Sequence, residues 1–316
     1  MSEFIPETKT SIWMNGEIVS WDDAKIHVMA IASVSCAIAV FEGIKAFPTK
    51  DDLCVFRLPE HTKRLFNSAK MYGMKIPYSE DEVSNAVVET LKTNDIHEEC
   101  YIRPAVYPGS ADIRIKKMVG KTPHLAIIVR PWPEISRKDL TLDESARRVF
   151  VPSWRRISSD VMVLKSKCVA NYANAFLAHI EAKQRGLDGA IMLDNQGFVC
   201  EGPGETVFIV KDKQLLTTPI YSPILASITR ETIIEYLSED MGYQAVERLI
   251  ERSELYTADE IFNCGTGTDV IPIVEVDGIT VGDGKTGPIT KQLAEYYREV
   301  VTGKVSNYQR WLTPVY

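Results

Sequence analysis

The chain has 316 residues, which exceeds the length at which a single hydrophobic core stops growing, so two domains are expected. With 45% hydrophobic and 25% charged residues, the composition is that of a soluble globular protein. The 36 basic and 43 acidic residues give a net charge of −7, which argues against nucleic acid or an anionic membrane as a partner.

The cysteines and histidines predict neither disulfides nor a metal site. The six cysteines contain no C-x-x-C pair, and the five histidines show no H-x-x-x-H spacing. The first residues are acidic, and no run of about 18 apolar residues occurs. We therefore expect a cytoplasmic protein without a metal ion or a membrane span.

The first part of the chain predicts an α+β unit. Asn15-Gly16 is typical of a two-residue hairpin turn between short strands. A helix that contains Arg64 is expected to begin at Pro59 and to stop at Gly73. Three more elements are expected here: a helix that begins at a capping box of Ser79 and Glu82, and strands at 101–107 and 125–129.

Two prolines predict where this unit ends. Pro131 and Pro133 each remove a hydrogen-bond donor and restrict the preceding residue, so regular structure is expected to break from Arg130 on. We expect a small α+β domain at 1–130 and a larger domain at 131–316. From the prolines alone, a surface loop explains the stretch nearly as well.

The stretch from Val161 to Tyr172 contains two lysines at a junction. Residues 161–164 are expected to form a buried strand that ends at Lys165 and Lys167. A partly desolvated lysine has a lowered pKa, and its neutral amine can attack an aldehyde to form a Schiff base. Solvated ammonium groups are the simpler interpretation of two lysines taken alone. A helix should follow, with four apolar residues on one face, namely Ala173, Phe176, Leu177 and Ile180.

Three later motifs are suited to anions or cations. In Glu201-Gly202-Pro203-Gly204-Glu205, two carboxylates flank a backbone that can take unusual dihedral angles. Ser227 predicts the N-cap of a helix whose first turn holds Ile228 and Thr229, and amides at such a start can receive a phosphate. Gly265-Thr266-Gly267-Thr268 is a turn that can direct backbone N–H groups at an anion. Each motif alone is weak evidence for a binding site.

Taken in order, the motifs resemble those of the fold-type IV pyridoxal-phosphate enzymes, most closely the branched-chain amino-acid aminotransferases. The order is an arginine in a first-domain helix, Tyr-Ile-Arg-Pro, Lys-x-x-x-Asn-Tyr, Glu-Gly-x-Gly-Glu, a helix start with Ile-Thr-Arg, and Gly-Thr-x-Thr. The resemblance runs from Ile12 to Leu312. It implies an α+β fold like that of D-amino-acid aminotransferase, with a small α+β domain, a larger domain with a β-barrel-like core, and the cofactor between them.

The resemblance implies pyridoxal 5′-phosphate as the cofactor. Lys167 stands four residues before Asn171-Tyr172, as the Schiff-base lysine of the family does, so Lys165 is expected to be structural. Glu201 resembles the carboxylate that pairs with the pyridine nitrogen. The other implied contacts are Arg64, Ile228, Thr229 and Thr266 to the phosphate, Tyr172 to the ring oxygen, and Leu225 to the ring face.

The resemblance also implies how substrates bind. Tyr101 and Arg103 match the pair that helps to hold the distal carboxylate of glutamate, which suits a bidentate guanidinium. The other implied contacts are Phe41, Gly43 and Trp132 in an apolar pocket, and Thr266 and Gly267 at the substrate α-carboxylate.

The implied activity is transamination of branched-chain or similar apolar L-amino acids with 2-oxoglutarate, which gives 2-oxo acids and L-glutamate. Lys167, displaced from the cofactor, would act as general base and acid toward the substrate Cα proton. At least a homodimer is implied, in which the neighbouring subunit supplies part of each substrate pocket.

Three positions depart from the family pattern. Cys36-Ala37 stands where Tyr-Gly is common, Val169-Ala170 replaces Gly-Gly, and Leu225-Ala226-Ser227-Ile228 replaces Leu-Pro-Gly-Ile. The first change removes a ring and a hydroxyl from the expected apolar pocket, which could shift substrate preference by about 1–3 kcal/mol. An aminotransferase for an unusual amino acid is therefore a second hypothesis.

The sequence is also compatible with two further kinds of protein. A sister enzyme would be a D-amino-acid or (R)-amine aminotransferase or an aminodeoxychorismate lyase, but Tyr101 with Arg103 favours the branched-chain enzymes. A non-enzymatic relative would bind the cofactor or a partner protein without turnover. The presence of both Lys167 and Glu201 argues against a protein of this kind.

Overall fold

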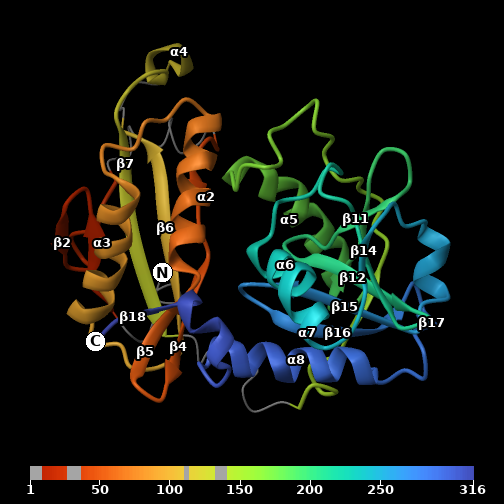
Figure 1. Ribbon diagram of the computed structural model, residues 1–316. Coiled ribbons are helices and arrows are strands. Elements are labelled where there is room, and N and C mark those ends of the chain that lie inside the picture. Colours follow the sequence, from red (N-terminus) through yellow and green to blue (C-terminus); the bar gives the residue numbers. More distant parts are fainter. Residues whose placement is uncertain (1–8, 27–36, 110–113, 132–140) are drawn as a thin grey trace. The chain divides into compact units, whose positions relative to one another are not determined.

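A computed structural model describes residues 9–26, 37–109, 114–131 and 141–316. The chain divides into two compact units. Figure 1 labels their helices and strands, with colours that follow the sequence from the N-terminus to the C-terminus. Unit 1 comprises Met1–Ser136, Ser166–Ala170 and Val301–Tyr316, and unit 2 comprises Arg137–Lys165 and Asn171–Val300. Each unit uses more than one stretch of chain, and the uninterrupted domains 1–130 and 131–316 remain a prediction.

The described part of unit 1 contains one eight-stranded sheet, with the order β18-β5-β4-β6-β7-β1-β2 and with β3 paired to β6. Neighbouring strands in it are antiparallel. The strands are β1 (Ile12–Met14), β2 (Glu17–Val19), β3 (Val40–Phe41), β4 (Ile44–Thr49), β5 (Asp52–Phe56), β6 (Cys100–Pro108), β7 (Pro123–Pro131) and β18 (Leu312–Pro314).

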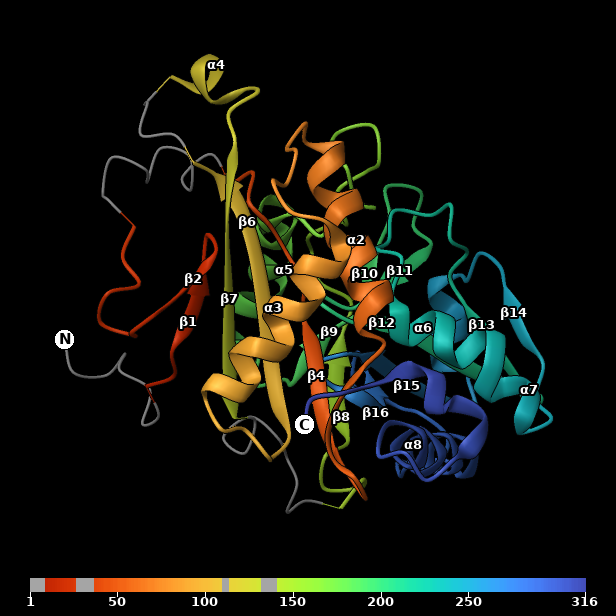
Figure 2. The ribbon, with the colours of Figure 1, turned by 60° about the vertical axis from the view of Figure 1, so that its left-hand side comes forward.

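The predicted turn and helices of unit 1 are confirmed. Asn15 and Gly16 both take positive φ angles, of 54° and 102°, as the β1–β2 turn requires. Helices α2 (Leu58–Met71) and α3 (Glu80–Thr93) cover one face of the sheet (Figure 2), and apolar side chains from both enter its core. The side chain of Ser79 accepts from the Glu82 amide and the Glu82 side chain accepts from the Ser79 amide, which completes the capping box. A short helix, α4 (Ile115–Met118), precedes β7.

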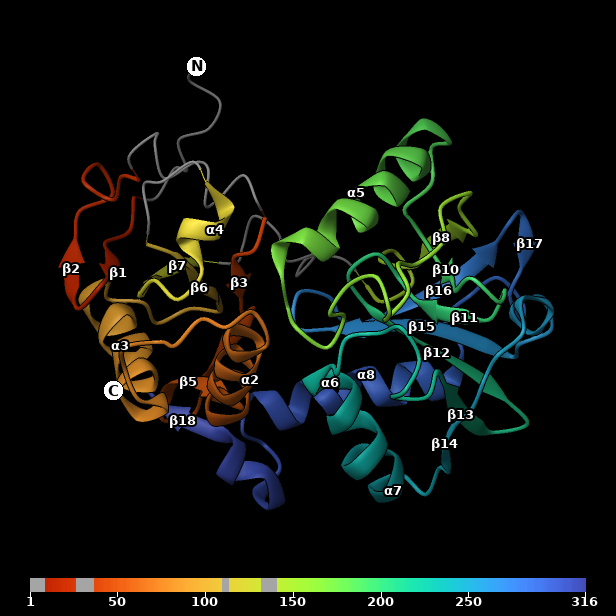
Figure 3. The same cartoon turned by 90° about the horizontal axis from the view of Figure 1, so that it is seen from above.

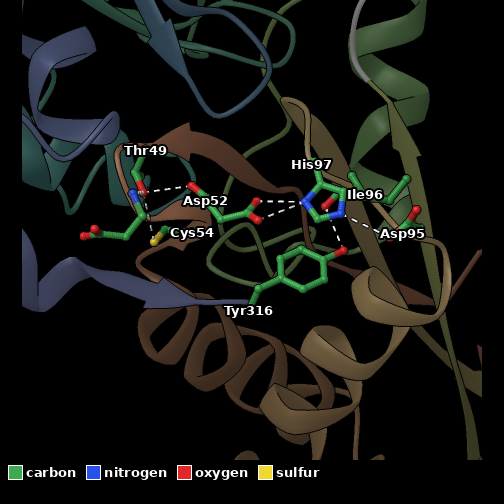
Figure 4. Close-up of polar contacts among 8 residues, drawn as sticks. Thr49, Asp52, Cys54, Asp95, Ile96, His97 and Tyr316 are labelled. Carbon is green, nitrogen blue, oxygen red and sulfur yellow. Dashed lines mark hydrogen bonds and ion pairs between the residues drawn. The ribbon is translucent and has the colours of Figure 1, made fainter.

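Within unit 1, the C-terminal residue Tyr316 packs against His97 (Figure 4). The His97 ring stacks on the Tyr316 ring at 4.3 Å between centroids. Nδ1 of His97 lies 2.9 Å from Asp52 and Nε2 lies 3.1 Å from Asp95. The Tyr316 hydroxyl donates to the Ile96 carbonyl over 3.1 Å, so Tyr316, the second residue after β18, is held by ring stacking and by a hydrogen bond.

Unit 2 contains a second eight-stranded sheet within its described residues, with the order β14-β13-β12-β15-β16-β8-β9 and with β17 paired to β16; β10 and β11 form a separate pair. Both parallel and antiparallel neighbours occur in the larger sheet. The strands are β8 (Arg147–Phe150), β9 (Gly189–Ala190), β10 (Met192–Leu193), β11 (Val199–Glu201), β12 (Thr206–Lys211), β13 (Gln214–Thr217), β14 (Ala245–Glu247), β15 (Glu260–Gly265), β16 (Asp269–Val276) and β17 (Ile279–Thr280).

Helices α5 (Val169–Gln184) and α8 (Pro288–Val301) lie on opposite sides of β15 and β16 (Figure 3). The helix predicted after Ser227 forms α6 (Ile228–Thr232), and Ser227 caps it by accepting from the Arg230 amide. It continues through a π-helical segment (Ile233–Leu237) into α7 (Ser238–Asp240). Short 3₁₀ segments occur at Arg252–Tyr256 and Ser306–Trp311.

Two local predictions are wrong. Residues 161–164 form no strand, and Val161 is 68% exposed. The helix predicted after them is α5; the face with Phe176, Leu177 and Ile180 is exposed, and Ala175, Ala178 and Ala182 are buried. Strand β7 continues through Arg130 and Pro131, which pair with Tyr101 and Cys100, because a proline at a strand end leaves most of the ladder intact.

Helices and sheets in both units confirm the α+β class. The five described cysteines, Cys54, Cys100, Cys168, Cys200 and Cys264, are buried and free. Among the described residues, none of the helices has the length and apolar character needed to cross a bilayer.

Candidate functional site

The backbone around Lys167 is fixed within unit 1. Its N–H donates to the Ser68 hydroxyl of α2 over 3.0 Å, and its carbonyl accepts from the Phe41 amide over 3.0 Å. The next amide but one, that of Val169, donates to the Ala39 carbonyl over 2.8 Å. The Lys167 Nζ lies 4.9 Å from the centre of the Phe41 ring. The predicted attachment lysine is therefore held at an aromatic face by a rigid backbone.

The other lysine of the pair has a different setting. Lys165 belongs to unit 2, where its Nζ donates to the carbonyls of Ile220, Ser222 and Ile224 over 2.5, 2.9 and 2.8 Å. Burial lowers the pKa of this ammonium group, although the Glu201 carboxylate opposes that shift. The three hydrogen bonds hold the loop at 220–224 in place and leave the amine poorly placed for other chemistry. This supports the expectation that Lys165 is structural.

Arg64 on α2 is oriented by a carboxylate that the sequence motifs do not single out. Its Nε and Nη2 donate to the two oxygens of Glu42 over 2.6 and 2.8 Å. Glu42 is fully buried, and His61 Nδ1 lies 2.8 Å from it. Burial alone raises the pKa of Glu42, but Arg64 and His61 outweigh it and hold the pKa far below its usual range. Arg64 is thus presented in one orientation, with Glu42 as a fixed anion.

Four predicted substrate residues lie together in unit 1. The Arg103 guanidinium lies 4.8 Å from the Phe41 ring centre, and its Nη2 donates to the Tyr101 hydroxyl over 3.2 Å. A Cβ on Gly43 would meet that hydroxyl at 2.2 Å, so the ring of Tyr101 lies directly against the Gly43 backbone. Strands β3, β4 and β6 bring these side chains together, because β3 and β4 both pair with β6.

Glu201, at the end of β11, is supported on both carboxylate oxygens within unit 2. Arg156 Nη2 lies 2.6 Å from Oε1, and both side chains are buried. The Leu225 amide donates to Oε2 over 3.2 Å. Leu225, the predicted ring-packing residue, therefore lies beside the predicted partner of the ring nitrogen.

The two glycine-containing turns of unit 2 lie at one edge of its sheet. β12 and β15 pair with Thr206 opposite Cys264, so the turn before β12 and the turn after β15 are neighbours. A Cβ on Gly265 would lie 3.8 Å from the Gly204 carbonyl. Thr266 and Gly267 lie in the second of these turns, which is closed by a hydrogen bond from the Thr268 amide to the Gly265 carbonyl.

The remaining predicted cofactor residues are on helices of unit 2. Ile228 and Thr229 are buried in the first turn of α6, where backbone N–H groups have no partner within the helix. Tyr172 lies in the first turn of α5 and is partly exposed. Trp132 and Cys36 lie outside the described residues.

Glu42 and Arg156 were not predicted from the sequence. Glu42 lies between Phe41 and Gly43, two residues that the resemblance does implicate, so its place in Phe-Glu-Gly was an available signal. Arg156 follows Arg155, and only burial distinguishes them: Arg156 is 7% exposed, whereas Arg155 is on the surface. Pairing across the fold, which the sequence does not display, identifies both.

Comparison with known proteins identifies relatives over nearly the whole chain. The family model described as amino-transferase class IV matches residues 39–276. A probable branched-chain-amino-acid aminotransferase of Aquifex aeolicus is 39% identical over 308 residues, which covers 96% of each chain.

Solved structures agree with this. The branched-chain aminotransferase of Thermoproteus uzoniensis with norvaline is 40% identical, with a TM-score of 0.91 and coverage of 98% of this chain and 100% of that one. The branched-chain amino acid aminotransferase of Thermobaculum terrenum in its PLP form is 36% identical, with a TM-score of 0.90 and the same coverage.

Proposed function

Because this chain belongs to the class IV aminotransferases, we propose that it uses pyridoxal 5′-phosphate to transaminate branched-chain or similar apolar L-amino acids with 2-oxoglutarate. The products are the matching 2-oxo acids and L-glutamate. The observation that carries the proposal is the identity of 39% over 96% of both chains with a branched-chain relative.

The donors and acceptors of the chain fit a phosphorylated pyridine aldehyde. Lys167 provides an amine beside an aromatic ring, and Glu201 provides a buried carboxylate in contact with a guanidinium. The buried hydroxyl of Thr268, next to the proposed phosphate-binding turn, has no hydrogen-bond partner among the described residues. Buried hydroxyl groups are rarely left unpaired, so a ligand at this turn is consistent with the site.

Each proposed cofactor contact matches the chemistry of one residue to one group of the cofactor. Lys167 Nζ would bind the aldehyde carbon, and Glu201 would hold a proton on the pyridine nitrogen. The phosphate would be bound by Arg64, Thr229 and Thr266 and by the Ile228 amide, while Tyr172 would orient the ring through its oxygen and Leu225 would pack on the ring face. When bound, pyridoxal phosphate supplies the electron sink for cleavage of the Cα–H bond.

Lys167 also moves the proton in the proposed reaction. Once an incoming amino group has replaced Lys167 on the cofactor, the freed Nζ would take the proton from the substrate Cα and deliver it to the carbon to which the lysine had been attached. The Lys167 backbone donates to the Ser68 hydroxyl and accepts from the Phe41 amide, and these two hydrogen bonds would hold it in place while Nζ moves. Positioning of this kind is what makes proton transfer by a side chain effective.

Substrate binding is proposed for two classes of acid. Phe41, Gly43 and Trp132 would line the apolar pocket, and Thr266 and Gly267 would bind the α-carboxylate. Tyr101 and Arg103 would hold the distal carboxylate of glutamate or 2-oxoglutarate, which a guanidinium can meet in bidentate fashion. The close contact of Arg103 with Phe41 and Tyr101 supports this, because one patch then offers apolar and cationic surface together.

We also propose that the chain forms at least a homodimer. Helix α5 exposes Phe176, Leu177 and Ile180 to the extents of 65%, 36% and 39%. Three large apolar residues on one helix face are seldom left in water, which favours a second copy as their cover. The cytoplasmic location expected from the sequence stays a prediction.

The test of the proposed activity is an absorbance and product measurement. With pyridoxal phosphate, the wild type should show a visible band of the lysine-bound cofactor, and L-leucine should remove it as 4-methyl-2-oxopentanoate forms. Lys167→Ala should lack the band and lose at least ~10³-fold in rate, because its base and attachment point are gone. Lys92→Ala, at an exposed lysine of α3, is the matched control.

Two outcomes would redirect the proposal. A band that L-leucine leaves unchanged would keep the cofactor assignment and point to another substrate, to be sought among D-amino acids and amines. A band of full strength in Lys167→Ala would contradict the role of Lys167 itself.

A further inference from the structure

Arg156 and Glu201 form a buried ion pair fixed to one hairpin of unit 2. Their side chains are 6% and 7% exposed, and Nη2 lies 2.6 Å from Oε1. The Arg156 amide donates to the carbonyl of Leu193 over 2.8 Å, and Leu193 belongs to β10, which pairs with the strand that ends at Glu201. Both charges are therefore held by the same short pair of strands.

The other two nitrogen atoms of the Arg156 guanidinium lack hydrogen-bond partners among the described residues. These atoms, Nε and Nη1, are both buried. A guanidinium has five N–H donors, and buried donors are normally paired. A buried ion pair that also leaves donors unpaired is a poor source of stability compared with apolar side chains of similar volume. Stability alone therefore does not explain why an arginine occupies this position.

The other oxygen of Glu201 is supported through Lys165. The Leu225 amide that donates to Oε2 directly follows the loop whose carbonyls, at Ile220, Ser222 and Ile224, surround the Lys165 ammonium. Lys165 thus fixes the loop that directs the amide at Glu201. One cation acts on Oε1 directly, and a second acts on Oε2 through the backbone.

We propose that Arg156 is a positioning residue that keeps Glu201 ionised and oriented toward the pyridine nitrogen of the cofactor; this rests on the proposed function. A carboxylate away from water favours its neutral form, and a guanidinium in contact with it reverses that preference. An ionised Glu201 accepts the ring N–H and so keeps the ring protonated. A protonated Glu201 would donate to an unprotonated ring, which withdraws electrons less strongly.

The two supports leave the carboxylate able to serve the ring. A carboxylate offers about four acceptor sites, so the contacts from Arg156 and from the Leu225 amide are compatible with a further hydrogen bond from the ring N–H. Arg156 itself touches neither the substrate nor the reacting atoms in this arrangement, so its effect has to pass through Glu201.

The test uses Arg156→Met and Arg156→Lys, with Arg155→Met as the matched surface control. Each protein is loaded with pyridoxal phosphate labelled with ¹⁵N in the ring, and the nitrogen chemical shift is measured. We expect a protonated ring nitrogen in the wild type and in Arg155→Met, a shift toward the unprotonated value in Arg156→Met, and partial recovery in Arg156→Lys. Turnover of L-leucine should fall by at least ~30-fold in Arg156→Met, with KM changed less than about threefold.

A double-variant cycle separates an effect through Glu201 from a general structural effect. In the Glu201→Gln background, Arg156→Met should change neither the ring-nitrogen shift nor kcat further, because the carboxylate on which Arg156 acts is absent. The double variant also removes both buried charges, so it stays informative if Arg156→Met alone does not fold.

The outcomes distinguish this inference from the proposed function. If the wild type binds no cofactor or holds an unprotonated ring nitrogen, the proposed role of Glu201 fails first. If the wild type behaves as expected but Arg156→Met keeps a protonated ring and full turnover, only the role of Arg156 is overturned. A further loss on adding Arg156→Met to Glu201→Gln would also overturn it, since the arginine would then act elsewhere.

Discussion

A methyl group at position 43 would collide with the side chain of Tyr101. A Cβ there would meet the Tyr101 hydroxyl at 2.2 Å and two ring carbons at 3.0 and 3.2 Å, so the whole ring has to move. The ring would take with it the hydroxyl that accepts from Arg103. Gly43 is therefore needed for close approach rather than for its backbone angles.

We predict that Gly43→Ala raises KM for 2-oxoglutarate by about tenfold, because the Tyr101–Arg103 pair loses its position. The free energy of unfolding should fall by about 1 kcal/mol or less, since Tyr101 and Arg103 are not fully buried and can turn outward. Steady-state kinetics and urea unfolding measure the two effects. Gly189→Ala, whose Cβ would meet only Val149 at 3.7 Å, is the control. An unchanged KM would show that the Tyr101 ring plays no part in binding 2-oxoglutarate.

At the scale of residues, the sequence indicated which residues belong to the candidate site, but it did not indicate which side chains they pair with. The choice between Lys165 and Lys167 could be made only through the resemblance, and the carbonyl cage of Lys165 supplies its physical basis. Glu42 and Arg156 were missed because their partners, Arg64 and Glu201, lie 22 and 45 positions away in the sequence. A buried ion pair leaves no periodic pattern in a sequence.

At the scale of elements, local signals succeeded where a capping residue or a turn fixed the backbone. The capping box before α3, the Ser227 cap of α6 and the Asn15-Gly16 turn depend on neighbours in the chain, and all three occur. The predicted strand at 161–164 failed because an apolar run does not reveal what covers it.

The contact between His97 and Tyr316 in unit 1 predicts a pH dependence of stability. Asp52 and then Asp95 raise the pKa of His97, which stacks on Tyr316. A pKa that is higher in the folded state than in the unfolded state means that the stabilisation is fully present below the unfolded pKa of about 6.5 and is lost as the pH rises through the folded pKa.

His97→Gln should therefore lower the free energy of unfolding more at about pH 6 than at about pH 8.5. Denaturant unfolding at both pH values measures the difference from the wild type. His179→Gln removes an exposed imidazole of α5 and is the control for the substitution itself. Equal losses for His97→Gln at the two pH values would mean that its charge does not contribute and that the stacked ring alone holds Tyr316.

At the scale of the whole molecule, the sequence predicted the α+β class and two domains, and the structure assigns two short stretches of the chain to unit 1. Sixteen C-terminal residues, Val301–Tyr316, belong to unit 1, and so do the five residues Ser166–Ala170. The stretch Ser166–Ala170 contains neither glycine nor proline, and Gly303 follows the start of the second stretch by two residues. The C-terminal stretch belongs to unit 1 because β18 pairs with β5, from which it is far apart in the sequence.

The proposed homodimer gives a prediction at this scale. Sedimentation or light scattering should find the wild type at no less than twice the chain mass. Phe176→Asp with Ile180→Asp should shift the protein toward the monomer, because two charges on an apolar interface oppose association. Val119→Asp changes a residue that is 79% exposed in unit 1 and should leave the assembly intact. A monomeric wild type would refute the proposal, and a dimer unaffected by the double change would place its interface elsewhere.

The short return of Ser166–Ala170 into unit 1 limits how such a protein can be recombined. A gene fusion with a relative that is joined once, between residues 136 and 137, takes Phe41 and Ser68 from one parent and Lys167 from the other. The chain passes between its units four times, after residues 136, 165, 170 and 300, so exchanging one unit intact requires four joints. Although Lys167 lies beyond the midpoint of the sequence, it has to be exchanged together with the N-terminal part of the chain.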